Sequence, residues 1–408
     1  MNKSNESHGK LHVVNEFDKP HAIFAAIILG FVGTAVTMGL PLLVGSIAES
    51  LHFSEKQLGW LASADMGGLF IGSVLTSRLV TRVNRRYLAI SGLLLVMISN
   101  YLCTHYTTID PLVLLRFAAG VGAGICYATC TASLAGSHNS ARTFSIFLLV
   151  LVSINALIFY IFPIIDAKWG VSGLFLFFML AAMPVFLVVP LIPSHNAEKT
   201  DDVVVMDEKS HAVQHIHIPN YLPWLCLAAV FSFYILVGAY WAFIERAGDA
   251  ANIQSDFISG TLTWGQVFSI TGTAMSIWMA KRFGQSKPLL FALSCMIIIM
   301  LVLTVEINHA TFLFSVFSFS LFWIFIDVFQ LGILSNIDHS GRYAALVPAS
   351  QGAAQAIAPM IAGLLLSYQF GYGAVMFMCA VGAAVALLIY IFVYTRLLKI
   401  VPDIADSE

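Results

Sequence analysis

Long apolar segments alternate with short polar connections along nearly the whole chain. A helix needs about 20 mostly apolar residues to cross a bilayer, so segments of this length predict transmembrane helices. Twelve such segments occur, at 21–48, 55–80, 87–105, 109–136, 142–165, 171–192, 221–246, 256–280, 287–306, 310–336, 342–368 and 372–398. The pattern therefore predicts an all-α membrane protein with twelve transmembrane helices.

The composition agrees with this pattern. Of the 408 residues, 59% are hydrophobic and 10% are charged, whereas a soluble domain carries about 25% charged residues. Residues 1–20 are polar and have neither an apolar core nor a small-residue cleavage site, so we expect a cytoplasmic tail rather than a removable signal peptide. The expected environment is the lipid bilayer, and the net charge of −2 gives no indication of a nucleic-acid partner.

Basic residues in the connections indicate the orientation. With the N-terminus inside, sixteen Lys and Arg fall on the inner side and three on the outer side, which fits the excess of positive charge on cytoplasmic loops. Both termini, including the tail at 399–408, are therefore expected in the cytoplasm. We expect an integral protein of a bacterial cytoplasmic (inner) membrane.

An internal repeat divides the helices into two sets of six. At an offset of 200 residues, TRVNRR at 81–86 aligns with KRFGQSK at 281–287, and Gly72 aligns with Gly272, without any insertion. Both sets enter from the same side, as in a parallel repeat about an axis along the membrane normal. We therefore expect two pseudo-symmetric six-helix bundles, at 21–192 and 221–398, joined by a cytoplasmic linker at 193–220.

The stretch LVLLRFAAGVGAG at 112–124 contains Leu112, Arg116, Gly120, Gly122 and Ala123. It resembles the helix 4 motif L-x-x-x-R-x-x-Q-G-x-G-A-A of the major facilitator superfamily of transporters, and the resemblance covers nearly the whole chain. In that family the Arg is commonly linked to proton coupling, which the resemblance implies for Arg116. It also implies the fold of that family, with its two six-helix bundles.

A second motif of the family, the loop G-x-x-x-D-R-x-G-R-R, is kept in part. SRLVTRVNRR at 77–86 retains Arg82, Arg85 and Arg86, and IWMAKRFGQS at 277–286 retains Arg282 and Gly284. In the family the acid of this loop steadies one conformation by contacting a neighbouring helix end. Both halves lack that acid and therefore its contact with the neighbouring helix end. The resemblance still implies a role in conformational change for the retained residues. The G-P-x-x-G-G motif of proton-driven drug exporters is absent as well.

Three ionisable residues, Asp65, Arg116 and Asp327, lie deep inside apolar segments. Such residues are costly in a membrane and usually face the bundle interior or a water-filled cavity. At roughly 1.5 Å per residue, Asp65 lies about 15 Å and Arg116 about 10 Å from the outer surface, so the Arg side chain can reach the acid. A static ion pair between two helices and a pair that opens during transport both remain open.

Polar and aromatic residues within the helices are candidates for a substrate cavity. Asp327 shares a helix face with Trp323 and Gln330, and the offset of 200 aligns it with Tyr127. The expected lining consists of Tyr127, Asn155, Tyr234, Trp241, Glu245, Trp323, Gln330, Gln351 and Gln355. Anchoring at the membrane interface is an open alternative for Trp241. Hydrogen bonding between helices is the alternative for Asn155.

Neither a metal nor a cofactor is expected. The six cysteines fall within predicted helices, where burial as small apolar side chains is the expected state. Cys126 and Cys130 on one helix face, and His211, His215 and His217 in the linker, are weak metal candidates. The chain has no glycine loop for phosphate, no His/Glu metal pair on one helix and no G-x-S-x-G elbow, so we do not expect an enzyme.

These observations together predict a monomeric secondary active transporter that works by alternating access around a site near mid-membrane. We expect a small organic solute, with an organic or aromatic anion held by Arg116 as the preferred class. We also expect proton coupling through Asp65 or Asp327, because a carboxyl group in a partly dry cavity can carry a proton at neutral pH. The alternatives are an efflux pump for amphipathic compounds and a membrane sensor, the latter disfavoured by the short linker and tails.

Overall fold

The computed structural model describes residues 16–80, 82–137, 140–194, 219, 221–337, 343 and 346–400. Within these ranges the chain is helical and contains no strand. The first half holds η1 (Glu16–Asp18), α1 (Pro20–Leu51), α2 (Glu55–Leu79), α3 (Arg85–Cys103), α4 (Ile109–Ala135), α5 (Ser140–Ala182), η2 (Met183–Leu187) and η3 (Val189–Leu191). The second half holds α6 (Tyr221–Ala250), α7 (Ser255–Phe283), α8 (Ser286–Val305), α9 (His309–Ile337), α10 (Val347–Ser367) and α11 (Gly371–Ile400).

The predicted all-α membrane fold is confirmed. In the described part of the chain, ten helices are long and apolar enough to cross a membrane, and α7, with its many Ser, Thr and Gly residues, is not among them. The helix ends agree with the expected segments to within a few residues, with two differences. Helix α10 begins at Val347 rather than at 342, and the segments expected at 142–165 and 171–192 lie together in one run of elements, α5 followed by η2 and η3.

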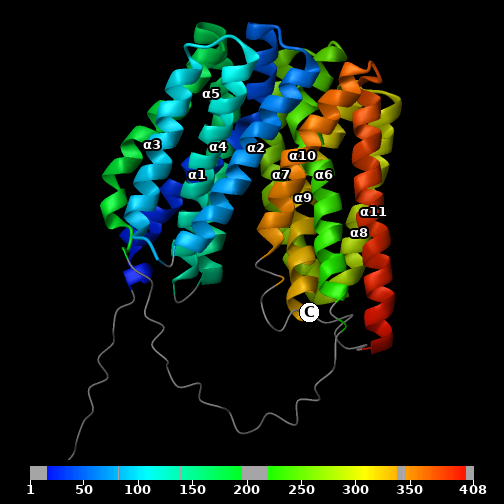
Figure 1. Ribbon diagram of the computed structural model, residues 1–408. Helices are drawn as coiled ribbons and strands as arrows, with labels where there is room; N and C mark the ends of the chain where they lie inside the picture. Colours follow the sequence, from blue (N-terminus) through cyan, green and yellow to red (C-terminus); the bar gives the residue numbers. More distant parts are fainter. Residues whose placement is uncertain are drawn as a thin grey trace, which may run out of the picture.

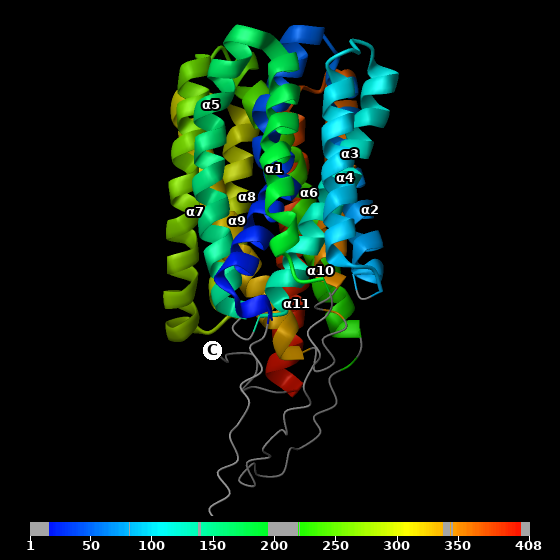
Figure 2. The same cartoon turned by 90° about the vertical axis from the view of Figure 1, so that its left-hand side faces the viewer.

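A break at Gly170 separates the two parts of α5. This residue has φ 58° and ψ −162°, in the region that favours glycine, and it interrupts the helical backbone. Figure 2 shows the chain reversing direction between the two parts at the upper end of the molecule. Counted as two, α5 makes the described helices consistent with the twelve segments expected from the sequence.

The helices form two bundles, α1–α5 and α6–α11, which stand next to each other in Figure 1. The main contacts between them join α2 to α10, α5 to α7 and α1 to α6. We call the end that holds the connections from α1 to α2 and from α6 to α7 the short-loop end, and the opposite end, where α6 begins, the linker end. The basic residues of the connections predict that the linker end faces the cytoplasm.

The internal repeat is visible as a pair of equivalent close contacts. A Cβ atom at Gly72 would overlap the carbonyl oxygen of Val121, and a Cβ atom at Gly272 would overlap the carbonyl oxygen of Leu321. Each partner is thus displaced by the same 200 residues as the glycines. Small residues let helix backbones approach closely, so α2 packs on α4 as α7 packs on α9.

Gly68 provides a direct test of this packing. A Cβ atom there would overlap the carbonyl oxygen of Phe117 and lie 2.8 Å from the amide nitrogen of Val121, both of which are backbone atoms of α4. We therefore expect Gly68→Ala to destabilise the protein by about 1–3 kcal/mol, the usual effect of overpacking. Gly260→Ala is the control, because nothing lies within 4 Å of a Cβ atom at that position. Thermal unfolding in detergent measures both, and equal melting temperatures would contradict the close approach of α2 and α4.

Candidate functional site

The two deep charges of the first half form a buried ion pair. Arg116 on α4 donates to both carboxylate oxygens of Asp65 on α2, from Nε at 2.9 Å and from Nη2 at 2.7 Å. Its remaining nitrogen, Nη1, donates to Oδ1 of Asn100 on α3 at 2.8 Å. The Arg116 side chain is 0% exposed, and its guanidinium lies 5.5 Å from the ring centroid of Phe175. The charge pair therefore ties α2, α3 and α4 together inside one bundle.

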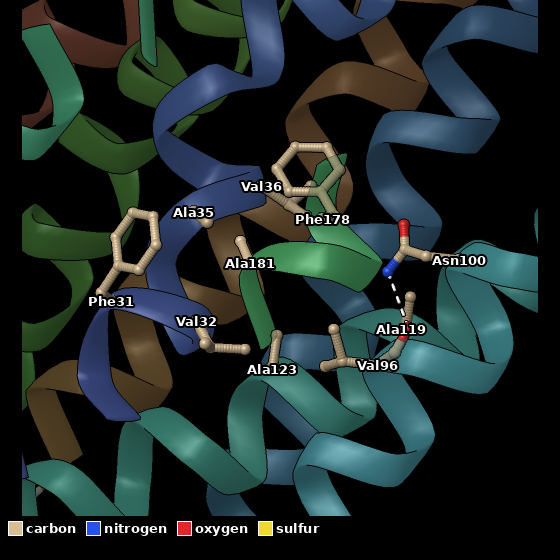
Figure 3. Close-up of a pocket in the computed structure, with 10 residues that line it drawn as sticks. All are labelled: Phe31, Val32, Ala35, Val36, Val96, Asn100, Ala119, Ala123, Phe178 and Ala181. Carbon is tan, nitrogen blue, oxygen red and sulfur yellow. Dashed lines mark hydrogen bonds between the residues drawn. The ribbon is translucent and has the colours of Figure 1, made fainter. Parts of the chain in front are cut away.

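A small void adjoins this network. Figure 3 shows Asn100 at its edge, with the amide nitrogen donating to the Val96 carbonyl at 2.8 Å. The void has a volume of about 10 Å³, which is close to the space that one water molecule needs, whereas ligand pockets measure about 300–1,000 Å³. It is lined mainly by apolar side chains of α1, α3, α4 and α5. This void is too small to be a substrate site.

The arrangement around Arg116 bears on the expected anion site. All three guanidinium nitrogens donate to Asp65 or Asn100. The side chain is also 0% exposed, so an anionic solute finds no surface by which to reach the guanidinium in this structure. That Arg116 holds the solute stays a prediction, and in this structure the residue forms an ion pair within the first bundle.

Asp327 on α9 is placed very differently. Its Oδ2 accepts a 2.6 Å hydrogen bond from the hydroxyl of Tyr234 on α6. That hydroxyl in turn accepts from the indole nitrogen of Trp323 at 3.3 Å. The other carboxylate oxygen, Oδ1, is buried and has no hydrogen-bond partner among the described residues. Asp327 is thus a deep acid that is only half satisfied by its own bundle.

An aromatic cluster extends from this acid toward the short-loop end. The rings of Trp323 and Trp241 lie 5.9 Å apart, and Phe319 lies 5.4 Å from Trp323 and 5.8 Å from Trp241. Trp241 also contacts the first bundle, because its indole nitrogen donates to the Thr37 carbonyl on α1 at 2.9 Å. The cluster therefore lines one side of the site at Asp327, and through Trp241 it also contacts the first bundle.

Tyr127 of the first bundle lies within electrostatic range of the same acid. Tyr127 lies close enough to both Asp327 and Tyr234 to interact with them electrostatically. The offset of 200 makes Tyr127 and Asp327 equivalent positions of the internal repeat. Two equivalent residues lie close together only when both are near the axis that relates the two halves. The site at Asp327 is therefore flanked by α4 of one half and by α6 and α9 of the other.

The other expected lining residues take several positions. Gln330 lies three residues beyond Asp327 on α9, is 1% exposed, and has neither amide atom paired among the described residues. Asn155 donates to Gln266 at 2.7 Å and so joins α5 to α7 across the two halves. Gln351 and Gln355 are half-buried on α10, and Gln355 packs against Gly238 of α6.

Glu245 does not belong to the site at Asp327. It packs against Gly45 of α1 near the short-loop end. Its neighbour Arg246 donates to Glu55 of α2 at 3.1 Å and to Asp249 at 2.8 Å. The hydroxyl of Tyr372 on α11 donates to the same oxygen of Glu55 at 2.7 Å. These residues form a polar contact that holds the two halves together at the short-loop end, which we call the short-loop latch (Glu55, Arg246 and Tyr372).

The retained residues of the family's loop motif lie at the linker end. Arg86 donates to the Ile192 carbonyl at 2.8 Å, and Arg85 is buried against the ring of Phe17, 4.5 Å away. Arg82 and Arg282 are exposed, and Arg282 lies over Trp278. Gly284 ends α7 with φ 70°, which explains a glycine there. The described contacts of Arg85 and Arg86 remain within the first half.

Several residues of these networks escaped the sequence analysis. They are Asn100, Glu55, Gln266, Thr37 and Tyr372, which complete the ion pair, the short-loop latch and the contacts between the halves. Asn100 carried a usable signal, because it is an amide within an apolar helix. Glu55 and Tyr372 lie in the first turns of their helices and look like ordinary end residues, so only the packing of the two halves reveals them.

Among the described residues, no three His, Cys, Asp or Glu side chains come together in a group that could hold a metal ion. The linker histidines His211, His215 and His217 lie outside the described residues. Cys126 and Cys130 are both buried free thiols.

Two repeat-related helical bundles with a polar site between them define the class as a membrane transporter of the two-bundle type. The family model described as Major Facilitator Superfamily matches residues 23–337. The chain therefore belongs to the Major Facilitator Superfamily.

Relatives with named functions match shorter stretches. The multidrug resistance protein MdtL of Shewanella oneidensis is 33% identical over 97 residues, which is 24% of each chain. The 4-hydroxybenzoate transporter PcaK of Acinetobacter baylyi is 27% identical over 97 residues, 24% of this chain and 21% of that protein. The gentisate transporter of Corynebacterium glutamicum is 22% identical over 283 residues, 64% of this chain and 62% of that protein. The matches thus span between about a fifth and three fifths of these relatives.

Solved structures agree in fold along almost the full length. A mutant form of the nucleoside transporter NupG has a TM-score of 0.70 at 9% identity and covers 92% of this chain and 99% of its own. A D-xylose-proton symporter has a TM-score of 0.69 at 15% identity and covers 95% and 98%. At these identities the similarity establishes the fold alone.

The buried pair of the first bundle yields a stability prediction. Removing one partner of a buried ion pair typically costs about 3–5 kcal/mol, because the other charge is left uncompensated. We therefore expect Asp65→Asn to lower the melting temperature strongly, and the double variant Asp65→Leu with Arg116→Met to recover most of the loss. Thermal unfolding in detergent measures both. A double variant as unstable as the single one would contradict the interpretation of the pair as a replaceable clamp.

Proposed function

We propose that this protein is a secondary active transporter that moves a small organic solute by alternating access, with the central site at Asp327, Tyr234 and Trp323. The observation that carries the proposal is the half-satisfied carboxylate of Asp327, whose Oδ1 is buried without a partner among the described residues. Buried polar groups are normally hydrogen-bonded, and unpaired ones within a membrane are costly. A ligand that pairs with this oxygen would remove the cost of leaving it unpaired, so the site is suited to binding a ligand.

Asp327 is also our proposed proton carrier. It lies at the boundary between the halves, within electrostatic range of Tyr127 of the first bundle, where solvent can reach it when the halves separate. Asp65 lacks this freedom, because Arg116 neutralises it within its own bundle. We therefore assign the coupling step to Asp327 rather than to the pair of the first half.

The contacts between halves support a state that is closed at the short-loop end. The short-loop latch joins α2 to α6 and α11, and Gly59 of α2 would overlap the Pro359 carbonyl of α10 if it carried a Cβ atom. The hydrogen bonds from Trp241 to Thr37 and from Asn155 to Gln266 continue this contact toward mid-depth. Rocking of the bundles would then expose the Asp327 site first from the linker end, which we place in the cytoplasm, and then from the other side.

The direction of transport has two candidates. The matches to 4-hydroxybenzoate and gentisate transporters and to a multidrug resistance protein favour a small aromatic or amphipathic solute in either direction. Export therefore stays the second candidate function. Uptake and efflux are distinguished by measuring solute movement in oriented vesicles with the proton gradient imposed in each direction.

Asp327→Asn tests the coupling role. We expect proteoliposomes with this variant to exchange solute when it is supplied at a saturating concentration, but to lose accumulation driven by a pH gradient, because the amide cannot take up and release a proton. Asp256→Asn, at an exposed acid in the first turn of α7, is the control and should accumulate solute like the unmodified protein. Gradient-driven accumulation by Asp327→Asn would overturn the assignment.

Glu55→Gln tests the short-loop latch. The loss of a hydrogen-bonded charge pair that is about a fifth exposed on each side should shift the equilibrium toward a state open at the short-loop end by about 0.5–1.5 kcal/mol, or roughly two- to tenfold. Spin labels at His105 and Asp256, exposed sites in opposite halves, report that opening as a longer distance. Glu306→Gln, at an exposed acid of the same end, is the control. An unchanged distance distribution in Glu55→Gln would rule the latch out.

A further inference from the structure

We infer that the site at Asp327 selects a small organic cation with an aromatic ring, and that it discriminates against carboxylate-bearing solutes of the same size. The inference rests on the proposed function, since it gives the charge class of the solute for that site. It replaces the anion expected from the sequence and follows from the charges and hydrogen-bonding groups around Asp327.

The first step is the balance of donors and acceptors. An ionised carboxylate only accepts hydrogen bonds. Asp327 receives one donor, the hydroxyl of Tyr234, and its Oδ1 is left open. The Trp323 indole N–H is already directed to Tyr234. When Asp327 is ionised, a ligand can supply the missing donor to Oδ1, which an ammonium group does with up to three N–H bonds and a carboxylate cannot do at all.

The second step is the absence of a counter-charge for an anion. Among the described residues, Arg116 is the basic side chain in the middle of a predicted span, and all of its nitrogens donate within the first bundle. Other described basic residues, such as Arg246, Arg282 and Lys287, lie near helix ends. An anionic solute beside ionised Asp327 would thus meet a like charge without compensation, and like charges in a low-dielectric site repel strongly.

The third step is the aromatic wall. Trp323 is half-buried beside Asp327 and backed by Trp241 and Phe319. The face of an indole attracts a cation within about 6 Å of its centroid, most strongly when water is excluded. The hydrogen bond to Tyr234 fixes the indole ring, so Trp323 offers a preoriented surface for the cationic head or for the ring of the ligand.

Gln330 adds a further polar contact on the same helix. It lies three residues beyond Asp327, and its amide oxygen and nitrogen are both unpaired and buried. A primary amide both donates and accepts. It can therefore bind a hydroxyl or ether substituent of the solute, whereas Asp327 binds the charged end.

Three probes with one ring and different charges test the inference on the purified full chain. They are 2-phenylethylamine, 2-phenylethanol and 3-phenylpropionate, which are cationic, neutral and anionic at neutral pH. A ligand that binds the folded state raises its melting temperature. We expect the amine to raise it by several degrees, the alcohol to raise it less, and the carboxylate to leave it unchanged.

Variants locate the effect. Asp327→Asn should weaken amine binding tenfold or more, whereas Asp327→Glu, which keeps the charge, should retain the preference for the amine, and Asp256→Asn should bind like the unmodified protein. If Asp327→Asn does not fold, the Glu variant and Gln330→Ala, with a smaller loss expected for Gln330→Ala, still report on the site.

Two results would overturn the inference and are distinguishable from each other. Stabilisation by 3-phenylpropionate that equals or exceeds that by the amine, and that is lost in Asp327→Asn, refutes the charge class but leaves the proposed site intact. Amine binding that is unchanged in a folded Asp327→Asn variant places the ligand elsewhere and refutes the proposed site as well.

Discussion

A carboxylate inside a membrane protein needs hydrogen-bond donors or an opposite charge, and this requirement organises the whole molecule. The two deep acids meet it in different ways. Asp65 is saturated by Arg116 and lies in a network that also holds Asn100 and joins three helices. Asp327 receives a single donor from Tyr234 and keeps one oxygen open at the boundary between the halves. The ion pair of Asp65 therefore holds the helices of the first bundle together. Among the described residues, Asp327 keeps an unpaired oxygen that a ligand or a proton can bind.

The same division between rigid and separable contacts runs through the packing. Within each bundle, glycines bring helix backbones into direct contact, as at Gly72 and Gly272. Between the bundles, α2 also packs closely on α10 at Gly59, and the polar contacts are a few hydrogen bonds and ion pairs, including the short-loop latch and the bond from Asn155 to Gln266. Groups of this kind can exchange protein partners for water at modest net cost. The halves can thus move as units around the site that lies between them.

Much of the fold was predictable because lipid imposes a simple pattern. Backbone polar groups must pair within each segment, so helix length and apolar runs reveal the spans, and the offset of 200 revealed the repeat. The contact of Asp65 with Arg116 also followed from helical rise. The inner surfaces were harder to predict. Glu245 shares a helix face with Trp241 but lies against Gly45, and Glu55 became visible as a latch residue only once α2 and α6 were placed together.

The central claim is that Asp327, and not Asp65, changes its protonation when the transporter binds a proton. Infrared difference spectroscopy of the protein in lipid, recorded between two pH values, measures this change as a carboxyl signal. The account predicts a signal that disappears in Asp327→Asn and persists in the double variant Asp65→Leu with Arg116→Met. A signal that persists in Asp327→Asn and disappears in the double variant would contradict it.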